Sequence, residues 1–180
     1  METSTAYSEK LNSTCTIYWE KLNSRAKIPT KRPEDAGLDI YTIEDNVVLK
    51  PLETRMFNTG FKSAFNKEFW IEVKERGSTG SIGLSVRSGV IDSGYRGEWK
   101  VILTNLNKFP IEFSSQTQKV VYEYRKWPFN KKLKKIIYPI SKAIAQAVII
   151  PLPQLVNKPW TAREIALSER GEGGWGSSGK

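Results

Sequence analysis

Residues 69–97 read FWIEVKERGSTGSIGLSVRSGVIDSGYRG, and this stretch decides the fold class. It begins with Phe69–Val73, a short run of aromatic and β-branched residues that favours a strand. Arg76–Gly83 and Arg87–Gly97 follow, and both are rich in glycine. Such glycines indicate either tight hairpins or backbone amides that lie close to a ligand. A short strand followed by dense turns predicts β structure.

Three further runs of the same kind predict strands elsewhere: Val47–Leu49, Val101–Thr104 and Ala147–Ile150. Pro, Gly, Asn or charged residues bound each of them. Helix-like composition is confined to Thr161–Ser168, a segment of about two turns. The chain therefore predicts an all-β barrel or sandwich of short strands joined by turns.

The composition excludes several classes of active site. The chain has 180 residues, of which 39% are hydrophobic, enough for one domain with its own core. It has no histidine, which excludes Ser-His-Asp and Cys-His catalysis and HExxH zinc sites. Cys15 is the only cysteine, so neither an intramolecular disulfide nor a cysteine zinc site can form. The remaining chemistry uses carboxylates, phosphate-binding loops or a metal ion.

Targeting signals are missing from the sequence. The lone cysteine fits a reducing compartment. No apolar run approaches the roughly 18 residues of a membrane span. The N-terminal METSTAYSEK lacks the basic-then-apolar layout of a signal peptide. We therefore expect a cytoplasmic protein with no membrane partner.

The positive charge is concentrated in one segment. The whole chain carries a formal charge of +9. Residues 107–142 hold nine basic residues against Glu112 and Glu123, a net +7 that leaves only +2 for the rest. The basic character therefore belongs to this segment rather than to the whole fold.

Residues 170–180, RGEGGWGSSGK, are rich in glycine and cannot hold a fixed conformation unaided. Composition alone favours a linker. The alternative is a flap that closes over a ligand, because Trp175 offers a stacking surface and Arg170 and Ser177 offer phosphate contacts.

Five local signals follow the order of the motifs of a known family. From about residue 36 to the C-terminus, the chain resembles the trimeric dUTPase family (dUTP nucleotidohydrolases), and the basic segment interrupts the likeness. The motifs are AGLDI at 36–40, RGSTG at 76–80 followed by Gly83-Leu84, GVIDSGYRGE at 89–98, AIAQAV at 143–148 and RGEGGWGSSG at 170–179. The third is the most specific, and the order of all five carries more weight than any one of them.

The resemblance implies a fold and an activity. The fold would be an all-β, distorted jelly-roll-like barrel, with residues 1–180 as one domain and three copies forming a homotrimer. The activity would be hydrolysis of dUTP to dUMP and pyrophosphate by in-line attack of water on the α-phosphorus, with Mg²⁺ as cofactor. This reaction limits uracil in DNA and supplies dUMP for dTMP synthesis. Each site would combine motifs from neighbouring subunits.

The third motif implies the catalytic group. Asp92 would orient and deprotonate the attacking water. The ring of Tyr95 would pack under the sugar and leave no room for a 2′-hydroxyl. The backbone of Gly89, Val90 and Ile91 would contact the substrate, since the hairpin between Leu84 and Asp92 reads the uracil edge in the family. Without the other motifs, Asp92 reads as a residue that caps a turn, and Tyr95 as an ordinary core residue.

Motifs one, two and four imply the phosphate and metal contacts. Asp39 would hold water molecules on Mg²⁺; its alternative is a surface residue that ends a loop. Arg76, Gly77 and Ser78 would contact phosphate, with several amides of the turn facing the anion. Gln146 would form hydrogen bonds near the α-phosphate and the attacking water.

The fifth motif implies a substrate-closing flap over residues 169–180. Arg170 would contact the γ-phosphate, Trp175 would stack on uracil in place of the usual Phe, and Ser177 would donate to terminal phosphate oxygens. Gly174 and Gly176 would contribute backbone contacts.

The chain departs from the family pattern at two positions. Gly77 stands where the family usually has Ser after Arg76. Lys142 and Ala143 stand where the family commonly has an acid and then Arg, so an arginine that ties the site together is missing. Arg87 and Arg125 are candidates to compensate for it.

Residues 113–140 resemble an insertion, because the stretch from Asp92 to Gln146 is about twice as long as in compact family members. We expect a surface hairpin in which Val120–Tyr124 pairs with Leu133–Tyr138 around a turn at Lys126–Lys132. Basic residues interleaved with aromatics favour a protein or nucleic-acid partner. A solvated decoration, or one that packs on a neighbouring subunit, is the alternative. Similar inserts occur in dUTPases of phages of Gram-positive bacteria, so a phage or prophage origin is the expectation.

Two other functions stay open on the sequence. One is a dCTP deaminase or bifunctional deaminase/dUTPase, which shares the fold; the intact third motif with Tyr95, and Trp175 in the tail, argue against it. The other is a weakly catalytic family member that acts as a regulator through its basic arm. Retention of Asp92 and Tyr95 favours an enzyme.

Overall fold

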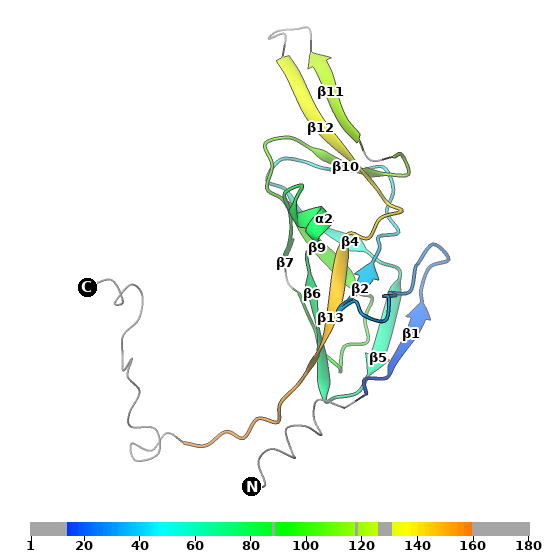
Figure 1. The fold of residues 1–180 in the computed structure, drawn as a ribbon, viewed down its shortest axis with the longest axis vertical. Helices are drawn as coiled ribbons and strands as arrows, with labels where there is room; N and C mark the ends of the chain where they lie inside the picture. The colour runs from blue at the N-terminus through cyan, green and yellow to red at the C-terminus, as the bar shows by residue number, and fades with distance from the viewer. Residues whose placement is uncertain (1–13, 88, 118, 126–130, 160–180) are drawn as a thin grey trace, which may run out of the picture.

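A computed structural model describes residues 14–87, 89–117, 119–125 and 131–159. Apart from one helical turn, α2 (Gly77–Gly80), the regular elements in these ranges are β-strands (Figure 1). The prediction of an all-β chain is confirmed. Within the same ranges no helix reaches the length and apolar character that crossing a membrane would need.

The strands form four small sheets. The first pairs β1 (Ile17–Lys21) with β5 (Phe61–Phe65), and the others follow the orders β4-β9-β7, β11-β12-β10-β3 and β2-β13-β6-β8. The bounds of the three-stranded sheet are β4 (Thr54–Asn58), β9 (Lys100–Asn105) and β7 (Leu84–Arg87). Those of the next are β11 (Lys119–Arg125), β12 (Lys131–Pro139), β10 (Ile111–Ser114) and β3 (Val47–Leu49). The last contains β2 (Gly37–Ile40), β13 (Ala145–Pro151), β6 (Phe69–Lys74) and β8 (Val90–Ile91).

The sheet β2-β13-β6-β8 positions most of the predicted site residues. In β6 the side chains of Phe69, Ile71 and Val73 are buried and those between them are partly exposed. This period of two is what a strand with one face on the core requires. Because β13 pairs with both β2 and β6, Gln146 lies opposite Asp39 on one side and Lys74 on the other.

Aromatic side chains fill the core between the sheets. Trp99 is 1% exposed, its indole nitrogen donates to the Ser63 hydroxyl at 3.1 Å, and its ring lies 5.4 Å from that of Phe61. Phe113 lies 4.7 Å from Phe57, also between ring centroids. Satisfying the polar end of a buried Trp keeps this burial favourable.

All four predicted strands are present. Val47–Leu49 matches β3, and the other three lie within β6, β9 and β13. The helix-like segment Thr161–Ser168 lies outside the described residues. The sequence did not predict α2, because Gly-Ser-Thr-Gly is a poor helix former.

The basic segment forms the predicted hairpin, but its strands run further toward the tip. Strands β11 and β12 are antiparallel, with Val120 opposite Ile136, and they project from the body in Figure 1. The turn was predicted at Lys126–Lys132. The structure corrects this, since Lys131 and Lys132 belong to β12 and pair with Arg125 and Tyr124. Neither lysine breaks strand pairing, so the ladder continues past them.

The base of the hairpin is part of the body. Strand β12 pairs in parallel with β10, and Ile136, Ile137 and Tyr138 are buried. The hairpin is therefore anchored through the core rather than attached by a flexible loop.

Candidate active site

The loop after β6 brings the second predicted motif to the surface. Arg76 is the N-cap of the one-turn helix α2. Its backbone N–H donates to the Thr79 hydroxyl at 3.0 Å, and that hydroxyl donates to the Arg76 carbonyl at 3.0 Å. Thr79 is fully buried, whereas Gly77 and Ser78 are exposed. The buried Thr79 thus fixes a loop that presents Gly77 and Ser78 outward.

Arg76 and Asp39 form an ion pair at the centre of the site. The Nε of Arg76 lies 2.8 Å from Oδ1 of Asp39, and its Nη2 lies 3.3 Å from Oδ2. The Nη1 of Arg76 donates to the Ser78 hydroxyl at 3.2 Å. Both charged side chains are about 30% exposed, so water and an incoming ligand reach them. An arginine fork in this state is available to exchange a carboxylate for a phosphate.

Gln146 connects this loop to β13. Its side-chain Nε2 donates to the Glu75 carbonyl at 2.7 Å. A Cβ on Gly37 would lie 2.4 Å from its Oε1, so only glycine leaves room for this amide. Asp39, Arg76, Gly77, Ser78 and Gln146 line one pocket of about 720 Å³. The chain therefore brings five of the predicted residues together.

The same pocket is also lined by residues that sequence reasoning did not assign to it. Thr30 accepts the backbone N–H of Asp39 at 2.9 Å, and Lys31 and Arg32 follow it along the wall. Arg32 is paired with Asp35 at 2.9 Å, which lowers the pKa of Asp35. Lys31 and Arg32, two basic residues just before the first motif, were the feature of the sequence that could have indicated an anion-binding wall here.

Tyr138 is a second residue that sequence reasoning did not assign to the site. It is fully buried, and its hydroxyl donates to the Ala143 carbonyl at 2.7 Å. Burial raises the pKa of Tyr138, although hydrogen bonding with Ser78 and the charge of Arg76 act in the opposite direction. Tyr138 thus packs behind the loop that presents Ser78, and it contacts Ala143, one of the two positions where the chain departs from the family pattern.

Asp92 lies in a tight turn after β8. Its carbonyl accepts the backbone N–H of Tyr95 at 3.0 Å. The Tyr95 hydroxyl donates to the Glu98 carbonyl at 3.0 Å. A Cβ on Gly97 would lie 2.4 Å from that hydroxyl, so the ring rests against glycine. Tyr95 is therefore held in one position although it is 44% exposed.

Asp92 does not share the pocket of Arg76 within one chain. It lines a separate hollow of about 290 Å³ with Trp70 and Leu152. Because Ile91 pairs with Ile71, Asp92 follows the end of β6 that contains Trp70, and Arg76 follows the other end. Trp70 and Lys74 alone are about 13 Å apart along the strand. Each copy thus separates the predicted base from the predicted phosphate pocket.

The remaining predicted residues divide into two groups. Val90 and Ile91 form β8, and the Gly89 carbonyl accepts the Val73 N–H at 2.6 Å. The flap residues Arg170, Gly174, Trp175, Gly176 and Ser177 lie outside the described residues. Within the described ranges, no three Asp, Glu, Cys or His side chains gather in a way that could hold a metal.

Comparison with known proteins decides the family. The dUTPase family model matches residues 24–123, which is more than half of the chain. The chain belongs to the dUTPase family. It is 36% identical over 152 residues to the deoxyuridine 5′-triphosphate nucleotidohydrolase of Nautilia profundicola, covering 82% of this chain and 86% of that protein. The corresponding protein of Clostridium kluyveri is 33% identical, covering 81% and 84%. The activity of the chain is accordingly that of a dUTP diphosphatase.

Solved dUTPase structures share the jelly-roll-like fold. A mutant dUTPase of Staphylococcus bacteriophage 80alpha in complex with dUpNHpp has a TM-score of 0.67 and 25% identity, covering 92% of this chain and 99% of that one. The dUTPase of phage phi11 of S. aureus, whose structure visualises a species-specific insert, has a TM-score of 0.62 and 24% identity, covering 81% and 96%. The expected likeness to phage members of the family is confirmed.

Proposed function

We propose that this dUTPase converts dUTP to dUMP and pyrophosphate at a site built from more than one copy of the chain. The Asp39–Arg76–Gln146 pocket of one copy would bind the phosphates, and the Asp92 hairpin of another would supply the base. The separation of Asp92 from Arg76 along β6 carries this proposal. In a single chain neither half can complete the reaction.

Phosphate binding in this pocket would replace the ion pair between Arg76 and Asp39. Arg76 leaves Asp39 and forms a fork with phosphate oxygens, because both side chains are partly exposed and the guanidinium suits either anion. Ser78 and the backbone N–H of the exposed Gly77 donate further hydrogen bonds. Gln146, held on the Glu75 carbonyl, stays at the wall and orients the α-phosphate.

The donor chemistry at Asp39 fits Mg²⁺. One carboxylate in a pocket open to water matches an ion that prefers oxygen ligands, keeps several waters and arrives with a substrate's phosphates. When bound, Mg²⁺ would neutralise charge on the triphosphate. Asp39, released from Arg76, would hold it through water.

The Asp92 hairpin would perform the proton transfer and select the sugar. The exposed Asp92 carboxylate orients a water in line with the α-phosphorus and accepts its proton. Tyr95 forms a wall under the deoxyribose. Because its hydroxyl is tied to Glu98 and its ring rests on Gly97, this wall does not yield to a 2′-hydroxyl. UTP would be rejected by shape.

The flap would complete the site from the C-terminal segment. Arg170 contacts the γ-phosphate, Trp175 stacks on uracil, and Ser177 donates to terminal phosphate oxygens. Closure would keep out water other than the nucleophile.

We assign the assembly to a homotrimer. After β13 the chain leaves the body in an extended course (Figure 1). Along it Leu152 is 50% exposed, Leu155 82% and Val156 74%. Apolar side chains presented in this way favour packing on another copy. Such an exchange would also bring the following flap toward a neighbouring site.

Pyrophosphate release from dUTP, dCTP, dTTP and UTP, each with Mg²⁺ and with EDTA, tests the proposal. Metal-dependent release from dUTP alone is expected. Release from UTP at a comparable rate would contradict the role of Tyr95. Ammonia release from dCTP would favour the deaminase alternative instead.

A further inference from the structure

Tyr138 is a buried polar residue beside the phosphate pocket to which the proposed mechanism gives no role. It lies near the C-terminal end of β12, and its side chain is completely buried. Its ring packs against Phe113, with 5.6 Å between the ring centroids. A phenol hydroxyl that is taken out of water needs hydrogen-bond partners, because an unsatisfied buried polar group is costly. The partners of this hydroxyl therefore indicate its role.

The Tyr138 hydroxyl supports the turn that leads into the fourth motif. It donates its proton to the Ala143 carbonyl at 2.7 Å. The same turn is closed by the Lys142 N–H, which donates to the Pro139 carbonyl at 3.0 Å. Three residues beyond Ala143, Gln146 lines the phosphate pocket. The phenol thus contacts a short segment that ends at a predicted site residue.

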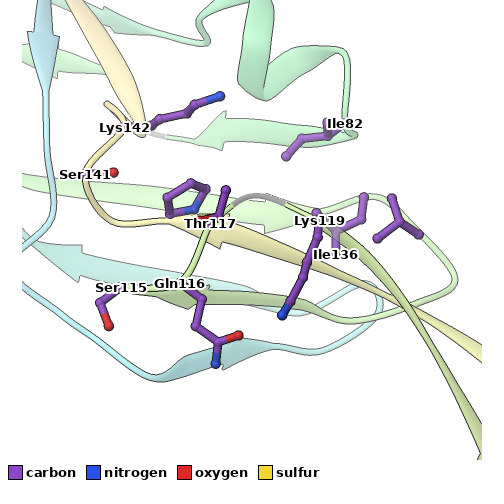
Figure 2. Close-up of a pocket in the computed structure, with 10 residues that line it drawn as sticks. Ile82, Ser115, Gln116, Thr117, Lys119, Ile136, Ser141 and Lys142 are labelled. Carbon is purple, nitrogen blue, oxygen red and sulfur yellow. The ribbon is translucent and has the colours of Figure 1, made fainter.

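The outer side of this turn borders a groove of about 710 Å³. Figure 2 shows the groove between the loop that contains Ile82 and the loops at 115–117 and 141–142. Residues 141–142 are exposed where they line it. Tyr138 supports the turn from inside the protein, where the hydroxyl is shielded from water.

The oxygen of the same hydroxyl also contacts the second motif. Burial raises the pKa of Tyr138, and hydrogen bonding with the side chains of Ser78 and Arg76 acts against this rise. A donor that points at the phenol oxygen lowers the pKa, because it favours the phenolate. Since the Tyr138 proton is directed to Ala143, the oxygen accepts from Ser78 and Arg76.

The guanidinium of Arg76 is therefore held on two sides. On one side, Nε and Nη2 face the carboxylate of Asp39 at 2.8 Å and 3.3 Å. On the other side, Nη1 donates to the Ser78 hydroxyl at 3.2 Å, and the Tyr138 oxygen accepts beside it. Asp39 is partly exposed and Tyr138 is buried. The guanidinium thus has one edge on a buried group and one fork on a partner that a ligand can replace.

We propose that Tyr138 is a positioning residue that directs the Arg76 fork toward the phosphates of dUTP. This inference rests on the proposed replacement of Asp39 by phosphate at Arg76. After that replacement, the contacts with Ser78 and Tyr138 remain and keep the guanidinium plane in place. The Ser78 proton turns to phosphate, and the phenol oxygen then accepts from Arg76 alone. Orientation matters because a planar guanidinium forms two parallel hydrogen bonds only in one alignment.

Tyr138→Phe tests the proposal, because it removes the hydroxyl and keeps the buried ring. Isothermal titration of the full chain with the imido analogue dUpNHpp, in the presence of Mg²⁺, measures phosphate binding without turnover. We expect the Kd to rise roughly threefold to tenfold, which is the effect of losing one hydrogen bond. The kcat/KM for dUTP should fall by a similar factor.

Deoxyuridine separates a lost phosphate contact from a general disturbance of the site. It has the base and the sugar of the substrate but no phosphate. Its inhibition constant should therefore change by less than about twofold in Tyr138→Phe. The midpoint of thermal unfolding should stay within about 5 °C of wild type, since the ring remains packed. An equal loss of affinity for deoxyuridine and dUpNHpp would make Tyr138 a purely structural residue and overturn the proposal.

A double-mutant cycle with Arg76→Lys tests whether Tyr138 acts through Arg76. Lysine keeps the charge but has no fork to orient, so Arg76→Lys alone should weaken dUpNHpp binding about tenfold or more. Adding Tyr138→Phe to Arg76→Lys should then cost less than about twofold. The matched control is Thr59→Val, which removes another fully buried hydroxyl that donates to a backbone carbonyl, that of Trp99 at 2.6 Å. It should change the affinity by less than about twofold in either background.

The outcomes distinguish this proposal from the proposed function. If Arg76→Lys binds dUpNHpp as tightly as wild type, Arg76 does not bind phosphate, and both proposals are wrong. If Arg76→Lys binds weakly while Tyr138→Phe binds like wild type, only the positioning role is wrong. A full, additive loss in the double variant would also overturn that role, because Tyr138 would then act independently of Arg76.

Discussion

At the scale of single residues, the ion pair between Arg76 and Asp39 is the contact that ligands of the proposed phosphate pocket would have to break. The pair satisfies two partly exposed charges in the free protein. Each partner is also the group that we assign to phosphate or metal. Phosphate would therefore bind Arg76, and Mg²⁺ would bind Asp39 through water. Because either ligand breaks the ion pair and frees the other residue, the two ligands should bind together more readily than either does alone.

Asp39→Asn tests this division. The amide would remove the carboxylate that we propose to hold Mg²⁺, so the Mg²⁺ concentration for half-maximal pyrophosphate release should rise by about tenfold or more. The matched control is Glu34→Gln, which removes one charge from a nearby exposed side chain. An unchanged Mg²⁺ requirement in Asp39→Asn would show that Asp39 does not hold the metal.

Gly37→Ala tests the packing of Gln146. The new Cβ would lie 2.4 Å from the glutamine Oε1 and 3.1 Å from its Cβ. Such overpacking should cost about 1–3 kcal/mol of stability and move the amide off the Glu75 carbonyl, which lowers kcat. Thermal unfolding and dUTP turnover measure both effects. Gly80→Ala, where a Cβ would meet only the Glu75 Cβ at 3.9 Å, is the control. Equal behaviour of the two variants would contradict this account.

The sequence predicted which residue types gather in the pocket, but not how they pair. The family resemblance assigned Asp39, Arg76 and Gln146 to the phosphate and metal contacts of a substrate site. That Arg76 holds Asp39 follows from register, since Asp39 faces Gln146 across β2 and β13. Tyr138 escaped prediction because its contact with Ala143 depends on the parallel pairing of β10 and β12, which local sequence does not specify.

At the scale of elements, the loop between β6 and β7 is stabilised by Glu75. Its Oε1 accepts the Val86 N–H at 2.7 Å and the Ser85 hydroxyl at 3.0 Å. Burial raises the pKa of Glu75, but the hydrogen bonds from the backbone and from Ser85 outweigh it, and the net pKa is lowered. A lowered pKa means that the charged form stabilises the fold above the unfolded-state pKa. This contribution is lost as pH falls through the folded-state pKa.

Glu75→Gln should therefore be destabilised by about 1 kcal/mol at neutral pH, a value that allows for solvent screening. The gap to wild type should begin to shrink as pH falls below about 4.5, where the carboxyl of the unfolded chain takes up a proton, and should close as pH falls through the lower pKa of the folded protein. Urea unfolding at a fixed protein concentration measures this gap. A gap that is constant across this pH range would contradict the pKa assignment.

The hairpin shows which part of an element local sequence can predict. Alternating residues predicted both strands, and the pairing of Val120 with Ile136 then sets every other partner. The predicted turn was too long at its C-terminal end, because Lys131 and Lys132 were assigned to it and belong to β12. Lysines are common on exposed edges of sheets, so charge alone does not end a strand.

Shortening the hairpin tests whether it contributes to hydrolysis. Replacing residues 123–133 with Asn-Gly would join Tyr122 and Lys134, which face each other, through a two-residue turn. Ile136 and Tyr138 stay in the core. We expect dUTP turnover within about twofold of wild type. A folded protein without turnover would show that the hairpin belongs to the active site.

At the scale of the whole molecule, the pocket of Arg76 and the hollow of Asp92 lie toward opposite ends of β6, and we assign them to two half-sites. The resemblance implied sites that combine motifs from neighbouring subunits, but the sequence did not indicate which motifs one copy keeps together, because motif order along the chain carries no distance. The sheet shows this separation, because Asp92 follows β8 toward one end of β6 and α2 follows the other end. A shared site also makes activity depend on assembly, so dilution below the dissociation constant of the oligomer should abolish turnover.

Complementation between inactive variants tests the shared site most directly. Asp92→Asn and Arg76→Ala are each expected to be inactive as pure oligomers. After co-refolding of an equal mixture, about a quarter of the sites would combine an intact Asp92 from one copy with an intact Arg76 from another. The control mixture of Arg76→Ala with Gln146→Ala should restore nothing, since both changes damage the same half-site. Recovery of about a quarter of wild-type pyrophosphate release is the predicted result, and a mixture no more active than its separate components would contradict a site shared between copies.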